Sequence, residues 1–153
     1  MSSAPPLQFT VKTPLLTLAA CAALADEPAK RLALRCEDGR LRLAFNIAAR
    51  PQGRRCIRVA AASLADYLEN PEALRTEKPG QARKEIEAIF HIMENALRTE
   101  SMARLLCCPA EHVRHLIQRR VLTLVRRGRD GRGHSALICK ESCIRFLEER
   151  RVC

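Results

Sequence analysis

The chain has 153 residues, 47% of them hydrophobic and 29% charged, and its formal net charge is +10 at pH 7. These proportions are typical of a soluble globular protein with one ordinary domain or two small ones, and they exclude an intrinsically disordered chain. Arginine provides 22 of the 27 basic residues, and its planar guanidinium favours contact with phosphates and guanine edges.

The first folded unit is expected at 15–70, after a proline-containing arm at 1–14 that we expect to be flexible. Thr17 is suited to cap a helix, and Pro28 fits the first turn of the next one. Alternating apolar residues around a turn with Pro and Gly predict a β-hairpin. The expected elements are helices over 18–24, 29–36 and 61–69 and strands over 41–47 and 55–59.

A connector at 71–98 follows, with a linker at 71–80 and a helix from Gln81 to about Arg98. Its apolar residues recur at spacings of three and four, which predicts one apolar stripe on an amphipathic helix. The stripe has two interpretations, packing against the rest of this chain or binding a second copy or a protein partner. Its members are Ile86, Ile89, Phe90, Met93 and Leu97.

The second unit, at 99–153, repeats the pattern of the first. Helices are expected from Thr99 or Ser101 to about Leu106, over 110–119 and over 140–150, and strands over 122–126 and 136–139. Between the two strands, Gly128, Gly131 and Gly133 permit a tight loop with positive backbone dihedrals.

The two units align without a gap at an offset of 81 residues, and at an offset of 79 beyond a loop that is two residues longer in the first. A repeat of this kind indicates one structural unit present twice. The first offset pairs Ala22, Leu24, Pro28, Ala29, Leu41 and Leu43 with Ala103, Leu105, Pro109, Ala110, Leu122 and Leu124. The second pairs Ser63, Tyr67, Leu68 and Glu69 with Ser142, Phe146, Leu147 and Glu148.

The eight cysteines are interpreted as packing thiols in a reducing compartment, because most of them stand where a small apolar residue would serve. Cys107, Cys108, His112 and His115 raise the question of zinc, but no CxxC pair exists and adjacent cysteines chelate poorly. We therefore expect no metal and no other cofactor.

The apolar segment 15–25 resembles the core of a secretory signal, and Leu18 to Cys21 resembles a lipoprotein cleavage box. Only Lys12 precedes it as a positive charge, and the same residues align with a helix of the second unit. We expect a cytoplasmic protein without membrane segments, because no apolar run reaches transmembrane length.

In each unit, two helices joined by a short turn match the order of a helix-turn-helix, whose second helix enters the major groove of DNA. In the second unit, Val113, Leu116 and Ile117 are expected to face inward. The outward side chains suited to base edges are Glu111, His112, Arg114, His115 and Gln118. The matching helix of the first unit offers mainly charge for phosphates, through Lys30, Arg31 and Arg35.

Basic residues surround both predicted hairpin loops, where they are suited to phosphates or the minor groove. They are Arg50, Arg54 and Arg55 in the first unit, together with Gln52 and Arg58, and Arg126, Arg127, Arg129, Arg132 and His134 in the second. Recurrence at the same place in both copies favours a function over a merely solvated loop.

Each unit resembles the winged helix-turn-helix of the excisionase and MerR-type family. The residues that carry the resemblance are 17–24 with 28–43, 102–106 with 109–113 and 116–122, and the closing helix 140–147. The resemblance implies binding to short duplex sites, to regulate transcription or direct recombination, often with bending of the DNA. The second unit departs from the family at Arg120, where Gly is usual and Gly39 stands in the first unit, so the geometry of that turn is open.

The expected fold is therefore mainly α with small β-hairpins (α+β), as two tandem winged helix-turn-helix units joined by an amphipathic helix. The expected function is sequence-specific binding of double-stranded DNA, as a bacterial or phage-type, nucleoid-associated transcription regulator, or as a recombination directionality or architectural factor. One alternative is a protein-interaction adaptor built on degenerate winged helices. RNA binding is disfavoured because stacking aromatics are scarce. No phosphate loop, HExxH or supported Ser-His-Asp order indicates an enzyme.

Overall fold

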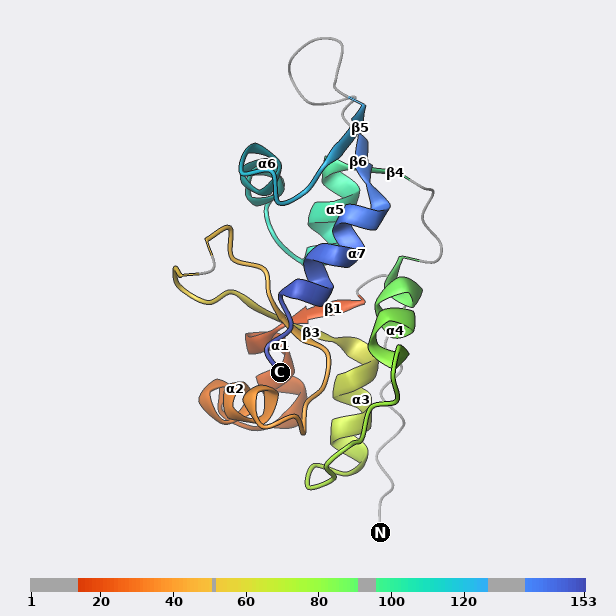
Figure 1. Ribbon diagram of the computed structural model, residues 1–153. Coiled ribbons are helices and arrows are strands. Elements are labelled where there is room, and N and C mark those ends of the chain that lie inside the picture. Colours follow the sequence, from red (N-terminus) through yellow and green to blue (C-terminus); the bar gives the residue numbers. More distant parts are fainter. Residues whose placement is uncertain (1–13, 51, 91–95, 127–136) are drawn as a thin grey trace.

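The computed structural model describes residues 14–50, 52–90, 96–126 and 137–153 (Figure 1). Within these ranges the protein is an α+β structure with seven helices and two three-stranded antiparallel sheets. None of the helices in the described part is long and apolar enough to cross a membrane. The arm predicted at 1–14 lies outside these ranges except for Pro14.

The first repeat runs from a short strand to a closing helix. Its elements are β1 (Leu15–Thr17), α1 (Leu18–Ala25), α2 (Ala29–Glu37), β2 (Ala44–Asn46), β3 (Ile57–Ala60) and α3 (Ala61–Glu69). The strands form a sheet in the order β1-β3-β2, with Ala44 opposite Val59. The predicted helices and hairpin are confirmed, with strand ends that differ by a few residues.

The second repeat has the same element order. It consists of β4 (Ala96–Arg98), α5 (Thr99–Leu106), α6 (Ala110–Gln118), β5 (Leu124–Arg126), β6 (Leu137–Cys139) and α7 (Lys140–Glu149), and its sheet order is β4-β6-β5. β4 lies 81 residues after β1, and α7 lies 79 residues after α3. The duplication read from the sequence is therefore present in the structure.

The sequence missed the two opening strands, β1 and β4. Each has three residues and leads directly into a helix, and each pairs with the returning strand of its own hairpin. The helix predicted over 81–98 is wrong beyond Ile89, because α4 (Gln81–Ile89) ends there and Leu97 lies in β4.

The turns that join the paired helices are built alike in both repeats. Asp26 ends α1 and Cys107 ends α5 in the left-handed region, at φ 52° and 55°. The next amides, of Glu27 and Cys108, donate to the carbonyls of Ala22 and Ala103 at 3.2 and 3.0 Å. This is a Schellman-type end, which satisfies carbonyls that the helix leaves open. Thr17 caps α1 as predicted, because its Oγ1 accepts from the Ala20 amide at 3.1 Å.

The turn at Arg120, whose geometry could not be predicted from the sequence, has the same backbone conformation as the matching turn of the first repeat. Gly39 has φ 84° and Arg120 has φ 59°, so both adopt the left-handed conformation. The Leu41 amide then donates to the Arg35 carbonyl at 2.9 Å, and the equivalent Leu122 amide donates to Leu116 at 3.3 Å. Arginine thus occupies a position where glycine is the unstrained choice.

The first sheet is a layer shared by two hydrophobic clusters. Ala44 and Val59 pack with α1, α2 and α3 in the smaller cluster, whereas their neighbours Phe45 and Ala60 belong to the larger cluster that includes Leu105 of the second repeat. Successive side chains of a strand point to opposite faces, so the second repeat covers the face of the first sheet that its own helices leave open.

The C-terminal segment also returns to the first repeat. Beyond α7, the Val152 amide donates to the Ala44 carbonyl at 2.9 Å, and Arg151 forms an antiparallel bridge with Phe45. These bonds extend the edge of the first sheet with residues from the end of the chain.

The apolar stripe of the connector packs inside the molecule. Ile86 and Phe90 are fully buried, Leu97 is 3% exposed and Ile89 packs against the same cluster, while Met93 lies outside the described residues. The structure therefore confirms internal packing as the role of the stripe. Ile86, Phe90 and Leu97 are therefore not available to a second molecule, contrary to the interpretation of the stripe as a partner surface.

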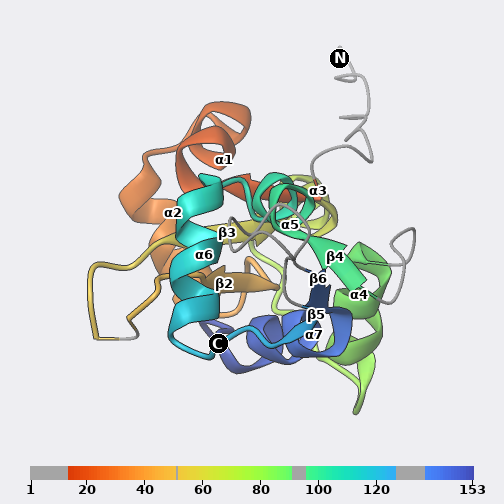
Figure 2. The same cartoon turned by 90° about the horizontal axis from the view of Figure 1, so that it is seen from above.

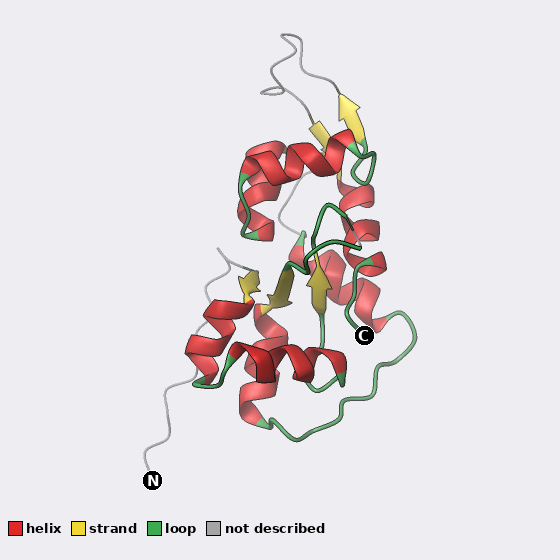
Figure 3. Cartoon of the chain, turned by 90° about the vertical axis from the view of Figure 1, so that its left-hand side faces the viewer, coloured by secondary structure: helices red, strands yellow, loops and turns green. Residues whose placement is uncertain are grey.

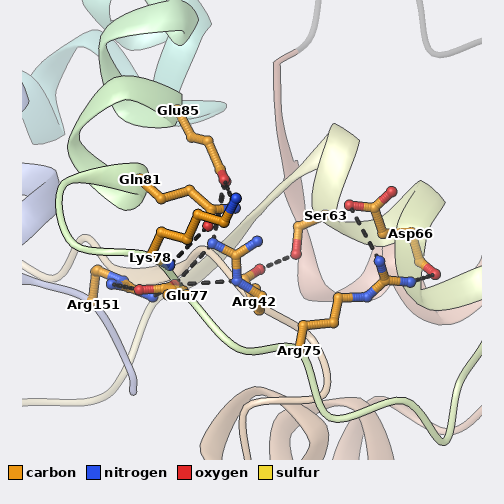
Figure 4. A network of polar contacts seen from close by, with 9 residues as sticks. All are labelled: Arg42, Ser63, Asp66, Arg75, Glu77, Lys78, Gln81, Glu85 and Arg151. Atoms are coloured by element: carbon orange, nitrogen blue, oxygen red, sulfur yellow. Dashed lines mark hydrogen bonds and ion pairs between the residues drawn. The ribbon is translucent and has the colours of Figure 1, made fainter.

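Acidic side chains of the connector bind arginines of both repeats (Figure 4). Glu77 accepts from the Arg42 Nη2 at 2.9 Å and from the Arg151 Nη1 at 3.1 Å, and Arg42 also reaches Glu85 at 3.3 Å. Hydrogen bonds from Arg151 and then Arg42 lower the pKa of the Glu77 carboxyl, against the opposing effect of burial. The connector is thus held by charge as well as by its apolar stripe.

Candidate nucleic-acid interface

The second helices of the two helix pairs, α2 and α6, lie on the same side of the molecule. Figure 1 shows both on the left, with the loop of the β2–β3 hairpin projecting between them, and Figure 3 shows both across the face toward the viewer. Viewed from above, α6 crosses over β2 and β3 (Figure 2). The fold therefore groups three of the segments that the sequence marked as DNA-binding.

Four of the five predicted base-reading residues form one exposed stripe on α6. Glu111, Arg114, His115 and Gln118 are exposed and recur at spacings of three and four, while Val113 and Leu116 are fully buried beneath them. Residues at these spacings share one helix face. Within the stripe, the His115 ring approaches the Glu111 carboxylate at 4.0 Å.

His112 does not join this stripe. Its Nε2 lies 2.6 Å from the carbonyl oxygen of Ile47 in the first hairpin, so this nitrogen carries the hydrogen and donates it. This contact engages Nε2 of His112 with the first hairpin and sets the residue apart from the exposed stripe.

On α2, Lys30 and Arg31 are exposed, as expected of phosphate contacts. Arg31 lies 3.8 Å from Glu27, and its side chain is 58% exposed. The assignment of Arg35 is corrected, because its side chain is only 15% exposed and its guanidinium binds Asp38 and Glu72, both at 3.4 Å. This residue supports the fold.

The first hairpin presents Arg50, Arg54 and Arg55, all exposed. Arg55 binds the Glu37 carboxylate at 2.7 Å, with both side chains about half exposed. Arg58 is not a surface contact, because its Nε and Nη2 both donate, at 2.9 Å, to the carbonyls of Leu106 and Cys107. It joins the first sheet to the end of α5.

The predicted contacts in the second hairpin cannot be placed in this way. Arg127, Arg129, Arg132 and His134 lie outside the described residues, and Arg126 is described by its backbone in β5 alone.

Arg119, which follows the last residue of α6 and is exposed, was not among the site residues predicted from the sequence. Arg119 lines a cleft of about 410 Å³ together with Ala49 and Arg50 of the first hairpin and with His115 and Gln118 of α6. Its position four residues after His115 could have placed it beside the stripe.

We define the basic face as the exposed polar residues of α2, the first hairpin and α6: Lys30, Arg31, Arg50, Arg54, Arg55, Arg114, His115, Gln118 and Arg119. Within the described residues, five of its cations have no carboxylate at ion-pair distance: Lys30, Arg50, Arg54, Arg114 and Arg119. Elsewhere in the described residues some arginines bind carboxylates, whereas Arg98 and Arg104 are exposed with no carboxylate at ion-pair distance. Arg83 alone contacts Glu87, Glu141 and Glu148 at 2.8, 2.6 and 2.9 Å. The basic face thus carries five cations that no carboxylate neutralises at ion-pair distance in the described part of the chain.

Three of the cysteines are buried and unsuited to reaction chemistry. Burial raises the pKa of Cys21 to about 11 and those of Cys36 and Cys143 to about 12, so these thiols stay protonated and unreactive at neutral pH. Over the described ranges, no three side chains of His, Cys, Asp or Glu converge on a metal position.

Comparison of the chain with family models, with curated proteins and with solved structures finds no match.

Proposed function

We propose that the protein binds double-stranded DNA in a sequence-specific manner, with its two repeats acting as tandem winged helix-turn-helix units of the excisionase and MerR type. The observation that carries this proposal is that α2, the first hairpin and α6, three of the segments predicted to contact DNA, share one face that carries five unpaired cations. Regulation of transcription or control of recombination is the role that such binding serves.

The reading helix in this proposal is α6. Arg114 and Gln118 lie on its exposed stripe, and both side chains have donors suited to guanine or adenine edges in the major groove. On α2 the exposed residues offer charge rather than amides, so α2 contributes phosphate contacts through Lys30 and Arg31.

The test is selection of bound duplexes from a random pool, followed by binding measurements on selected and scrambled duplexes. Arg114→Ala and Gln118→Ala should reduce the preference for the selected duplex by about tenfold, since a good base contact is worth about 1–3 kcal/mol. Lys30→Ala should weaken binding to both duplexes equally. The control is Lys84→Ala, which removes an exposed lysine of α4 outside the basic face and should change neither. Equal losses on both duplexes for Arg114→Ala and Lys30→Ala would contradict this division of roles.

A second candidate function, the protein-interaction adaptor, is favoured by two exposed leucines near the same helices. Leu34 of α2 is 62% exposed and Leu24 of α1 is 42% exposed. A stable complex with another protein, lost in Leu34→Ser and formed without any DNA affinity, would favour the adaptor.

A further inference from the structure

The first hairpin is anchored to the second repeat at three successive residues. The Asn46 amide donates to the Arg150 carbonyl at 2.8 Å, the Ile47 carbonyl accepts from His112 at 2.6 Å, and the Ala48 carbonyl accepts from the Arg150 Nη1 at 3.0 Å. Ile47 is fully buried and Ala48 is 6% exposed. The second repeat therefore fixes the base of this hairpin, directly beside α6.

Just beyond the anchor, the hairpin and α6 enclose the cleft of about 410 Å³ lined by Ala49, Arg50, His115, Gln118 and Arg119. Two arginines from different repeats line it, together with a histidine and a glutamine. None of its lining residues carries a carboxylate. Guanidinium groups match the geometry of phosphate oxygens and bind them with charge-assisted hydrogen bonds.

We propose that this cleft is an anion site that holds one backbone phosphate of a bound duplex, clamped between Arg50 of the first repeat and Arg119 of the second. This inference rests on the proposed function. It changes how the two repeats are expected to contact the DNA. The hairpin of the first repeat serves the reading helix of the second, so the two repeats form one composite reader.

The neighbouring arginines of the hairpin do not share this role. Arg55 binds Glu37, the last residue of α2, at 2.7 Å. The Arg55 side chain therefore reaches toward α2 of its own repeat. Neither Arg54 nor Arg55 lines the cleft. Arg54 is therefore the matched comparison for Arg50, because it is an exposed arginine of the same loop outside the cleft.

The test is a double-mutant cycle on the full chain, with duplex binding measured by fluorescence anisotropy at several salt concentrations. Arg50→Ala and Arg119→Ala should each weaken binding about tenfold and lower the salt slope by about one. The double variant should lose much less than the product of the two single losses, because both side chains hold the same phosphate. The double variant Arg54→Ala with Arg119→Ala should lose affinity by the full product of its two single losses. Multiplicative losses in the first pair, or no loss in either single variant, would overturn the clamp.

A second arm uses inorganic phosphate as the probe and amide chemical shifts as the readout. Shifts confined to Arg50, Gln118, Arg119 and their neighbours, and lost in Arg50→Ala, support the anion site. If the wild-type protein does not bind duplex DNA, the proposed function is overturned, and so is the clamp on a duplex. Phosphate shifts at the cleft would then support an anion site for free phosphate alone, and their absence would overturn the anion site as well.

Discussion

Arg120 is strained in a way that its counterpart Gly39 is not. Both residues are left-handed, but only glycine adopts this conformation without steric cost. Arg120→Gly should therefore raise the free energy of unfolding by about 1 kcal/mol, measured by urea denaturation. Gly39→Ala should lower it by a similar amount, and since a Cβ there would meet nothing within 4 Å, backbone strain is the whole effect. A less stable Arg120→Gly variant would contradict this account.

Glu77 makes the stability of the protein depend on pH. Its pKa is lowered by Arg151 and Arg42, so its contribution is fully present above the unfolded pKa of about 4.3 and is lost as the pH falls through the lower folded value. Glu77→Gln should destabilise the protein by about 2 kcal/mol at pH 7. The free energy of unfolding of the Glu77→Gln variant should also fall less than that of the wild type between pH 7 and pH 3.

The control for this change is Glu87→Gln. Glu87 binds Arg83 four residues earlier on α4 and is about half exposed, and exposed pairs at this spacing contribute about 0.3–0.5 kcal/mol. Similar losses for the two variants, or an unchanged pH dependence in Glu77→Gln, would contradict the assigned role of Glu77.

Residue roles could be predicted where the cause is local in sequence. The cap at Thr17 and the burial of Val113 and Leu116 follow from spacing alone. The roles of His112, Arg35 and Arg58 could not be predicted, because their partners Ile47, Glu72 and Leu106 lie 65, 37 and 48 residues away. A side chain suited to DNA is equally suited to a carbonyl or carboxylate that folding brings beside it.

At the scale of elements, helices and hairpins were predictable because their periodicity extends over enough residues. β1 and β4 were not, since a strand of three residues shows no clear alternation and exists only through pairing with β3 and β6. The early end of α4 was also missed, because Leu97 continues the helical spacing of the apolar stripe although it lies in β4.

The role of α4 as an internal support predicts a large cost for removing the apolar side chain of Phe90, which caps its C-terminus. Phe90 is fully buried, so Phe90→Ala should lower the free energy of unfolding by about 3–5 kcal/mol through lost burial and a cavity. Leu74→Ala, at a linker residue that is 71% exposed, should change it by less than about 0.5 kcal/mol. Small effects of both changes in thermal or urea denaturation would show that α4 does not support the core.

At the scale of the whole molecule, the two repeats are joined through the first sheet, the returning C-terminus and the connector. The duplication could be predicted from the two constant offsets. The sharing of one sheet between the repeats could not, because it depends on which face of each strand meets the other copy, and both faces of β2 and β3 carry apolar residues.

This joining predicts a single cooperative unfolding transition. Tyr67 is the only tyrosine and the chain has no tryptophan, so its fluorescence reports on the core of the first repeat, where it is 1% exposed. The transition followed by Tyr67 should coincide with that followed by circular dichroism, which reports on both repeats. Separate midpoints would indicate repeats that unfold independently.

The measurement that tests the central claim most directly is the salt dependence of binding to duplex DNA. Lys30, Arg54 and the pair Arg50 and Arg119, which share one phosphate, predict a slope of about −3 in a plot of log affinity against log salt concentration, at about 0.9 per phosphate contact. Lys30→Ala should make the slope shallower by about one, and Lys84→Ala should leave it unchanged. A slope near zero, or equal effects of the two lysine variants, would contradict duplex binding by this face.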